Sequence, residues 1–191
     1  MSQMLRRLRQ DHVNLQKLLF ILERQIAALD RRERPDWDII EGAIDYLLTY
    51  PDLRHHPMED RILRCLQAKD PSAAAPFQDL DTQHREQSSA LRRIAAATRH
   101  VLQDASMPRQ GYVGLLSGFV AARRDHIRNE EAGFFPAAER SLSAADWTEL
   151  EAEGPDISDP LTDDPVERRF GVLRRNLDAW DAADRFQHQA D

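Results

Sequence analysis

The amino-acid sequence predicts an all-α fold, an antiparallel up-down four-helix bundle with an additional C-terminal helix. Apolar residues recur at every third or fourth position along several long segments, which is the period of an amphipathic helix. Short charged or proline-containing stretches separate these segments, and the alternation typical of strands is nearly absent. Long helices joined by short links favour antiparallel neighbours that share one core.

The first two helices follow from the N-terminal part of the chain. Leucine and isoleucine side chains mark a helix over residues 3–30, with His12 on its apolar stripe. After a charged connection, Asp36 can cap a second helix. Because prolines lack a backbone donor and clash with the preceding turn, we expect a break or kink between Tyr50 and Pro57.

Two more helices occupy the middle of the chain. A second break is predicted at residues 69–76, and an apolar stripe over residues 77–101 then predicts the third helix, with His84 near its start. Residues 104–110 contain a proline and turn the chain. The apolar stripe over residues 112–134 predicts the fourth helix.

These elements divide the chain into three parts. We expect residues 1–150 to form the bundle as one domain. Residues 151–165 are rich in Asp and Pro and predict an acidic, irregular connection. Residues 166–191 predict an amphipathic helix that packs on the bundle or on a partner, which includes a second copy in a homodimer.

Composition excludes several classes of protein. A hydrophobic content of 41% and a charged content of 31% argue against a disordered or membrane-spanning chain. The net charge of −7 argues against nucleic acid as the main partner. Cys65 is the only cysteine, so no intrachain disulfide forms, and no segment has the apolar run of a membrane helix or a signal peptide. We therefore expect a cytoplasmic protein with no membrane partner.

A histidine and acid pattern occurs twice along the chain. Each half is a histidine followed by a distant His-x-x-x-Glu pair, and the gap between its two histidines is 43 residues in the first half and 42 in the second. The members are His12, His55 and Glu59, then His84, His126 and Glu130. A spacing of four places a His and a Glu one turn apart on one helical face. The pattern predicts one metal site assembled from two similar halves. His100 and Asp104 share the spacing, but we exclude them because they lie late in the third helix without a counterpart in the first.

The predicted topology brings the six residues into one layer. Helices one and three have their histidine early, and helices two and four have their His and Glu late, so an antiparallel bundle aligns them. Burying these groups without a cation would cost several kcal/mol. Imidazole and carboxylate without thiolate suit iron, manganese or zinc. Two bridging Glu and four terminal His best match a metal pair, with positions left for water, an oxo or hydroxo bridge, or a diatomic ligand.

Four segments carry a resemblance to a known family. They are DH at 11–12, YPDLRHHPMEDRIL at 50–63, QHRE at 83–86 and DHIRNEEAGFFPAAE at 125–139. In these segments the chain resembles the hemerythrin-like, or HHE cation-binding, family of four-helix bundles with a non-haem di-iron centre. The likeness extends from Met4 to Leu150. It implies two Fe ions, with Mn or Zn as alternatives, four terminal histidine ligands and two bridging glutamates at the residues named above.

One departure from that family bears on function. Oxygen-carrying hemerythrins have a second helix-three histidine four residues from the first, whereas Leu80 and Ser88 stand at those places here. The resemblance then implies a more open metal ion, which favours NO, peroxide or redox sensing over reversible oxygen storage. Further side chains that can join the site are His56, Asp60, Tyr50 and Tyr112.

The leading hypothesis is a cytoplasmic di-iron protein that binds or reduces a small oxidant, such as O2, peroxide or NO, with stress sensing as one use. One alternative is a helical binding module in which the metal is structural. Another is an iron storage or delivery protein without catalysis. No residue is predicted to be catalytic, and the sequence leaves open whether the protein is an enzyme.

Overall fold

The computed structural model describes residues 2–103, 108–152, 170–171 and 173–176, and every element in them is helical. This agrees with the all-α prediction. The α-helices are α1 (Gln3–Asp30), α2 (Trp37–Leu47), α3 (His56–Lys69), α4 (Pro71–Ala74), α5 (Leu80–Leu102), α6 (Arg109–Asn129), α7 (Phe135–Ser141) and α8 (Ala144–Ala152). Two π-helical turns, Pro51–His55 and Glu130–Phe134, and a 3₁₀ turn, Ala75–Phe77, lie between these helices.

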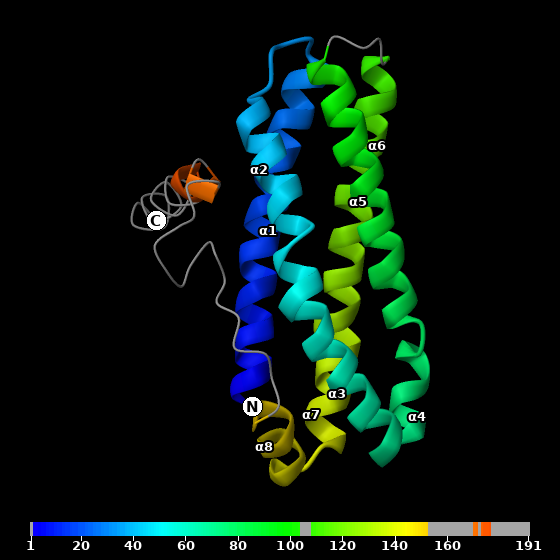
Figure 1. Ribbon diagram of the computed structural model, residues 1–191. Helices are drawn as coiled ribbons and strands as arrows, with labels where there is room; N and C mark the ends of the chain where they lie inside the picture. Colours follow the sequence, from blue (N-terminus) through cyan, green and yellow to red (C-terminus); the bar gives the residue numbers. More distant parts are fainter. Residues whose placement is uncertain (1, 104–107, 153–169, 172, 177–191) are drawn as a thin grey trace, which may run out of the picture.

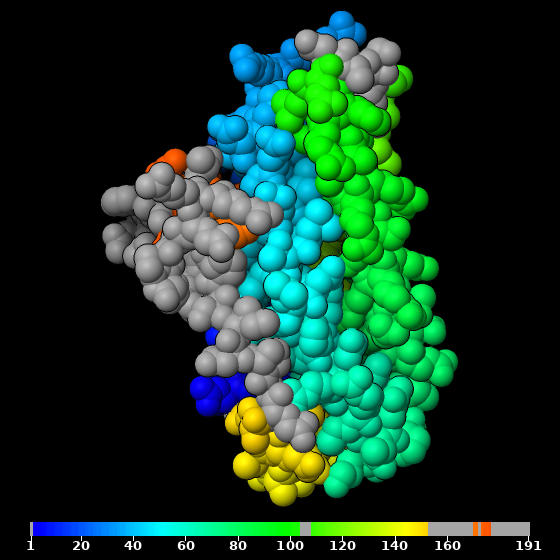
Figure 2. Space-filling model, in the orientation of Figure 1, coloured from blue at the N-terminus to red at the C-terminus, as the bar shows by residue number. Residues whose placement is uncertain are grey.

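Four helical rods lie side by side along one long axis (Figure 1). Two of the rods are α1 and α5, and the other two join α2 to α3 and α6 to α7 through the π-helical turns. The chain reverses direction from one rod to the next (Figure 1). Both α1 and α5 pack against α2 and α6. The short helices α4 and α8 close one end of the molecule (Figures 1 and 2).

Side-chain caps begin the first two helices where the sequence predicts. The hydroxyl of Ser2 accepts a hydrogen bond from the backbone N–H of Leu5 at 3.1 Å, and α1 has the predicted bounds. The carboxylate of Asp36 accepts from the N–H of Ile39 at 3.2 Å. Each cap satisfies a backbone donor that the first helical turn leaves unpaired.

The π-helical turns lie where prolines follow. Pro57 and Pro136 each occupy the second position of the helix after a π-helical turn. Because a proline ring clashes with the carbonyl four residues before it, a wider turn at that place accommodates the ring and lets the rod continue. The break predicted between Tyr50 and Pro57 is therefore a widened turn within one rod. The second widened turn, in the fourth predicted helix, was not predicted.

Other boundaries differ from the sequence prediction by local structure. The break predicted at residues 69–76 contains α4 and the start of the 3₁₀ turn, so α5 begins at Leu80 instead of residue 77. Helix α8 was not predicted. Its Trp147 and Leu150 are buried against the end of the bundle, which explains a helix with little amphipathic pattern of its own.

A short part of the predicted C-terminal helix contacts α2. Residues 170–171 and 173–176 are helical and lie beside α2 (Figure 1). Phe170 meets the Tyr46 ring edge-on at 6.0 Å between centroids, and Leu173 is buried against the same apolar cluster. The remainder of the predicted helix, residues 153–165 of the connection and residues 104–107 of the predicted turn lie outside the described residues.

The described core consists of two apolar clusters with a polar layer between them. Leu15 and Leu19 of α1 belong to one cluster, and Leu5 and Leu8 belong to the other. Between them lies His12, and the other rods place buried polar side chains at the same level. Among the described helices, none combines the length and apolarity that a membrane crossing requires.

Candidate metal centre

The six candidate ligands predicted from the doubled pattern meet in this polar layer. Each of the six residues is buried, with at most 5% of its surface exposed. They are His12 from α1, His55 and Glu59 from the second rod, His84 from α5, and His126 and Glu130 from the fourth rod. By contrast, His100 is exposed, and Asp104 lies outside the described residues. The structure thus assembles the predicted set and leaves the excluded histidine in solvent.

The candidate ligands form two groups that share both glutamates. One group is His12, His55, Glu59 and Glu130, and the other is Glu59, His84, His126 and Glu130. In each group one atom from every residue lies within 4.8 Å of the others. The Nε2 atoms of His12 and His55 are 3.1 Å apart, so both point at one place. Each group offers two imidazoles and two carboxylates to an ion.

Each glutamate turns one oxygen toward each histidine pair. Glu59 places Oε1 3.2 Å from Nε2 of His55 and Oε2 3.4 Å from Nε2 of His84. Glu130 places Oε1 2.8 Å from Nε2 of His126 and Oε2 3.3 Å from Nε2 of His12. Carboxylates that divide their oxygens in this way are suited to bridge two cations.

Unsatisfied buried atoms show that these residues fit a cation. Both carboxylate oxygens of Glu59 and of Glu130, and Nε2 of His84 and His126, are buried without a hydrogen-bond partner among the described residues. Leaving a buried charged group unpaired costs more than the roughly 1–3 kcal/mol typical of a neutral group. Donor atoms that converge without bonding one another are expected of a ligand set. Nitrogen and oxygen donors without thiolate suit iron, manganese or zinc.

The outer nitrogen of each histidine faces an oxygen acceptor, which leaves Nε2 for the centre. Nδ1 of His12 lies 2.8 Å from Oε1 of Glu131, and Nδ1 of His55 lies 3.2 Å from Oδ2 of Asp11. Nδ1–H donors bonded to carboxylates fix the tautomer and the ring orientation.

The second histidine pair is supported in a similar way. Nδ1 of His126 lies 3.1 Å from Oε1 of Gln83, a hydrogen-bond distance. Nδ1 of His84 lies 3.5 Å from Oδ1 of Asp60, which is an ion-pair distance and too long for a good hydrogen bond. Asp60 is therefore a charged neighbour of His84 that belongs to neither ligand group.

Tyr50 continues the support behind His55. Its hydroxyl donates to Oδ1 of Asp11 at 3.1 Å, and Arg54 donates to the same hydroxyl at 3.3 Å. Two hydrogen bonds, through Asp11, therefore connect Tyr50 to the candidate ligand His55. Tyr112 lies elsewhere, in the apolar cluster, where its hydroxyl pairs with Thr98 at 2.7 Å.

His56 lies beside the candidate ligands but is not a member of either group. Its ring stacks on His84 at 4.0 Å between centroids. Its Nδ1 lies 3.2 Å from Asp52, and its Nε2 lies 3.0 Å from Nη1 of Arg123. Burial, with the Arg123 charge second, holds the pKa of His56 well below its usual value. A neutral His56 that accepts from Arg123 has both ring nitrogens engaged by protein groups.

Protons partly balance the carboxylates of the centre. Burial alone would lower the pKa of His12, but the neighbouring carboxylates, that of Glu130 first, raise it to about 11. The pKa of His84 is raised to about 11 against the same burial effect. Burial would raise the pKa of Glu59, yet the neighbouring histidines hold it well below its usual value. The site therefore stabilises positive charge at its centre.

A comparison with family models matches residues 3–138 to the hemerythrin HHE cation binding domain. The chain belongs to this family. A search of curated proteins and a search of solved structures each gave no match. The matched range contains all six candidate ligands, so this HHE domain holds the buried His and Glu cluster inside the segment that defines the family.

Proposed function

We propose that this HHE domain is an antiparallel four-helix bundle that holds two iron ions and binds or reduces a small oxidant, O2, NO or peroxide, a chemistry suited to stress sensing. The observation that carries the proposal is the orientation of Glu59 and Glu130, each of which presents one oxygen to each histidine pair. We also infer a reducing, cytoplasmic compartment from the single cysteine, Cys65.

The donor set supports chemistry at the metal as well as metal binding. Four imidazole nitrogens and the four oxygens of two carboxylates supply eight donor atoms. Two six-coordinate ions take about twelve. Iron, when bound, supplies electron transfer and positions for a small ligand. The protein orients the Nε2 donors through Asp11, Gln83 and Glu131 and excludes water with apolar clusters on both sides of the layer.

Metal analysis tests this proposal directly. Protein purified from iron-supplemented cells should contain about two irons per chain and show iron-dependent absorption in the near ultraviolet. His84→Ala should lose most of that iron, and the exposed His100→Ala should retain it. Absence of bound metal in the wild-type chain, with melting unchanged by a chelator, would reject the proposal.

Redox titration separates oxidant chemistry from a structural role for the metal. The reduced, iron-loaded protein should change its absorption spectrum when O2, NO or peroxide is added. A structural role is the second candidate, because the polar layer divides the apolar core and a cation there would join the four rods. Iron that stays bound but responds to neither dithionite nor air would favour that candidate. Readily exchanged iron without peroxide turnover would favour storage or delivery.

A further inference from the structure

A hollow adjoins the half of the centre formed by His84 and His126. Its volume is about 340 Å³, and it lies between the start of α5, the 3₁₀ turn and the second π-helical turn. It is lined by Phe77, Leu80, Gln83, His126, Glu130 and Gly133. Glu130 and His126 are candidate ligands, so one wall of the hollow belongs to the metal centre itself.

The lining of the hollow combines the apolar side chains of Phe77 and Leu80 with the amides of Gln83 and Asn129. Leu80 lies one helical turn before His84 on the same face of α5 and is 4% exposed. A leucine at that place offers no donor atom to a metal, so it would add no ligand to the half that holds His84 and His126. A hollow of this volume beside two candidate ligands has room for a small molecule such as O2 or NO.

Phe77 lines the hollow from the 3₁₀ turn, and Gly133 permits its position. A Cβ atom placed on Gly133 would lie 3.0 Å from Cε1 and 3.1 Å from Cζ of Phe77, closer than ordinary contact. The glycine therefore lets the ring rest against the π-helical turn. The side chain of Phe77 is half-buried and also meets Phe134 at 5.5 Å between ring centroids.

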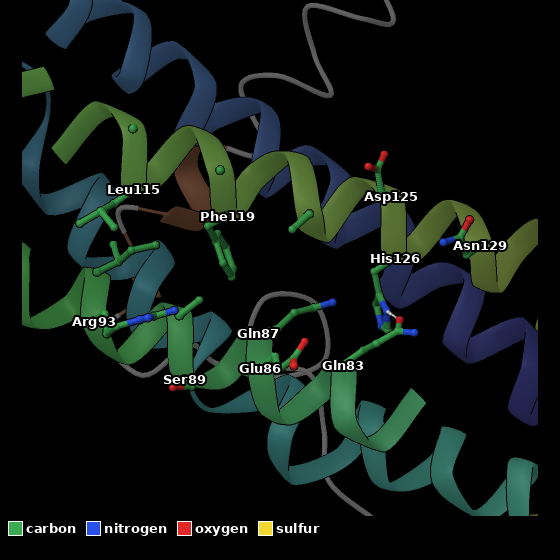
Figure 3. A pocket seen from close by; sticks show the side chains of 15 residues that line it. Gln83, Glu86, Gln87, Ser89, Arg93, Leu115, Phe119, Asp125, His126 and Asn129 are labelled. Carbon is green, nitrogen blue, oxygen red and sulfur yellow. Dashed lines mark hydrogen bonds between the residues drawn. The ribbon is translucent and has the colours of Figure 1, made fainter. Parts of the chain in front are cut away.

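A larger groove between α5 and α6 is the competing approach. Its volume is about 790 Å³, and Figure 3 shows Gln83 and His126 at one end, joined by their hydrogen bond. An added Cβ at Gly118, on the α6 side, meets nothing within 4 Å. The groove reaches the outer side of His126, whose Nδ1 is engaged by Gln83. The hollow, in contrast, is lined by Glu130, which both histidine pairs share.

We propose that a small oxidant reaches the metal pair through this hollow and binds on the half formed by His84 and His126, with Leu80 keeping that position open and Phe77 covering it. The inference rests on the proposed function and adds to it the half that reacts and the residues that control access. Leu80 and Phe77 act as access and specificity residues, since neither offers a donor atom to the metal.

Leu80→His tests the open position on metal-free protein. A histidine one turn before His84 would add a nitrogen donor to the same half, so Co²⁺ should bind at least about tenfold more tightly than to the wild type. Unchanged or weaker Co²⁺ binding by the folded variant overturns the proposal. Because this titration needs no oxidant, it decides the inference even where the wild type proves inert to O2, NO and peroxide.

Phe77→Ala tests the cover and does not depend on how Leu80→His folds. Removing a half-buried rim side chain should speed NO association with the iron-loaded protein by about tenfold, within the range that mutations change such rates. Gly118→Leu narrows the α5–α6 groove and serves as the matched control, with an unchanged association rate. If Gly118→Leu slows association and Phe77→Ala leaves it unchanged, the groove is the route and the proposal is wrong.

Discussion

Three histidines of the centre, His12, His55 and His126, take their orientation from a chain neighbour of another candidate ligand. Asp11 precedes His12 in the sequence but bonds the outer nitrogen of His55. Glu131 follows Glu130 but bonds His12. Because adjacent helical residues point about 100° apart, one residue of such a pair faces the metal centre and the other faces the adjoining rod. The sequence shows that these residues are chain neighbours of candidate ligands. It does not show which histidine each one bonds, because that depends on how the rods pack.

Asp11→Asn removes the negative charge next to His55 and tests whether Asp11 holds that ring in place. An amide at position 11 keeps the size of the side chain but weakens acceptance from Nδ1 of His55, so Co²⁺ affinity should fall about 10–100-fold. The measurement is a Co²⁺ titration of metal-free protein. Asp81→Asn is the control, since Asp81 is exposed and pairs only with Arg85 among the described contacts. Equal affinity in both variants would argue against a role for Asp11 in holding His55.

The raised pKa values of His12 and His84 predict how metal binding depends on pH. Both imidazoles have a pKa of about 11 in the metal-free fold, so at neutral pH an ion must displace a proton from each. Raised folded-state pKa values add stability below about pH 6.5 that declines as pH rises toward 11. The metal-free protein should therefore lose melting temperature between pH 6.5 and 8.5, while the increase produced by Co²⁺ grows. A Co²⁺ effect that shrinks as pH rises would contradict this assignment.

At the scale of the elements, prolines explain which boundaries the sequence could predict. The caps at Ser2 and Asp36 and the apolar period between them define α1 and the start of α2. Pro57 and Pro136 both disturb their rods, but sequence alone does not distinguish a kink from a widened turn. The difference matters because His55 and Glu130 lie in those turns.

The junction between the second and third rods depends on Asp70. Its carboxylate accepts from the N–H of Ala73 at 3.0 Å, from the hydroxyl of Ser72 at 2.7 Å and from that of Ser141 in α7 at 2.8 Å. One side chain thus caps α4 and ties it to the fourth rod. The sequence predicts only a break at this segment, because the hydrogen bond to Ser141 of α7 joins residues far apart in the chain.

Asp70→Ala should lower the free energy of unfolding by about 1–2 kcal/mol, the usual cost of losing a helix cap. Asp79→Ala is a matched control, because Asp79 stands at the start of α5 without a side-chain cap bond. Urea denaturation of the two metal-free variants measures the difference. If both variants lose the same stability, the bonds of Asp70 contribute nothing beyond local helix propensity.

For the whole molecule, the level of each ligand along its rod was the most informative feature of the sequence. His12 and His84 lie in the first half of their rods, and His55 and His126 lie just past the middle of theirs. The chain direction alternates from rod to rod (Figure 1), and the four histidines meet in one layer. The hollow beside Glu130 could not be predicted in this way. It depends on Phe77 lying over Gly133, a contact between residues that no periodic pattern relates.

The polar layer between the two apolar clusters predicts how much bound metal raises the free energy of unfolding. Without a cation, Glu59 and Glu130 bring two carboxylates into the middle of the protein, where unpaired charge is costly. Metal that binds only the folded state should add about 2.7 kcal/mol to the free energy of unfolding when its free concentration is 100 times its dissociation constant.

Glu130→Gln removes a carboxylate that both groups share, so at the same metal concentration most of this gain should disappear. His100→Ala, exposed and far from the layer, should keep the full gain. Thermal and urea unfolding with and without Co²⁺ measure both variants, and an equal gain in the two would show that the ion binds elsewhere.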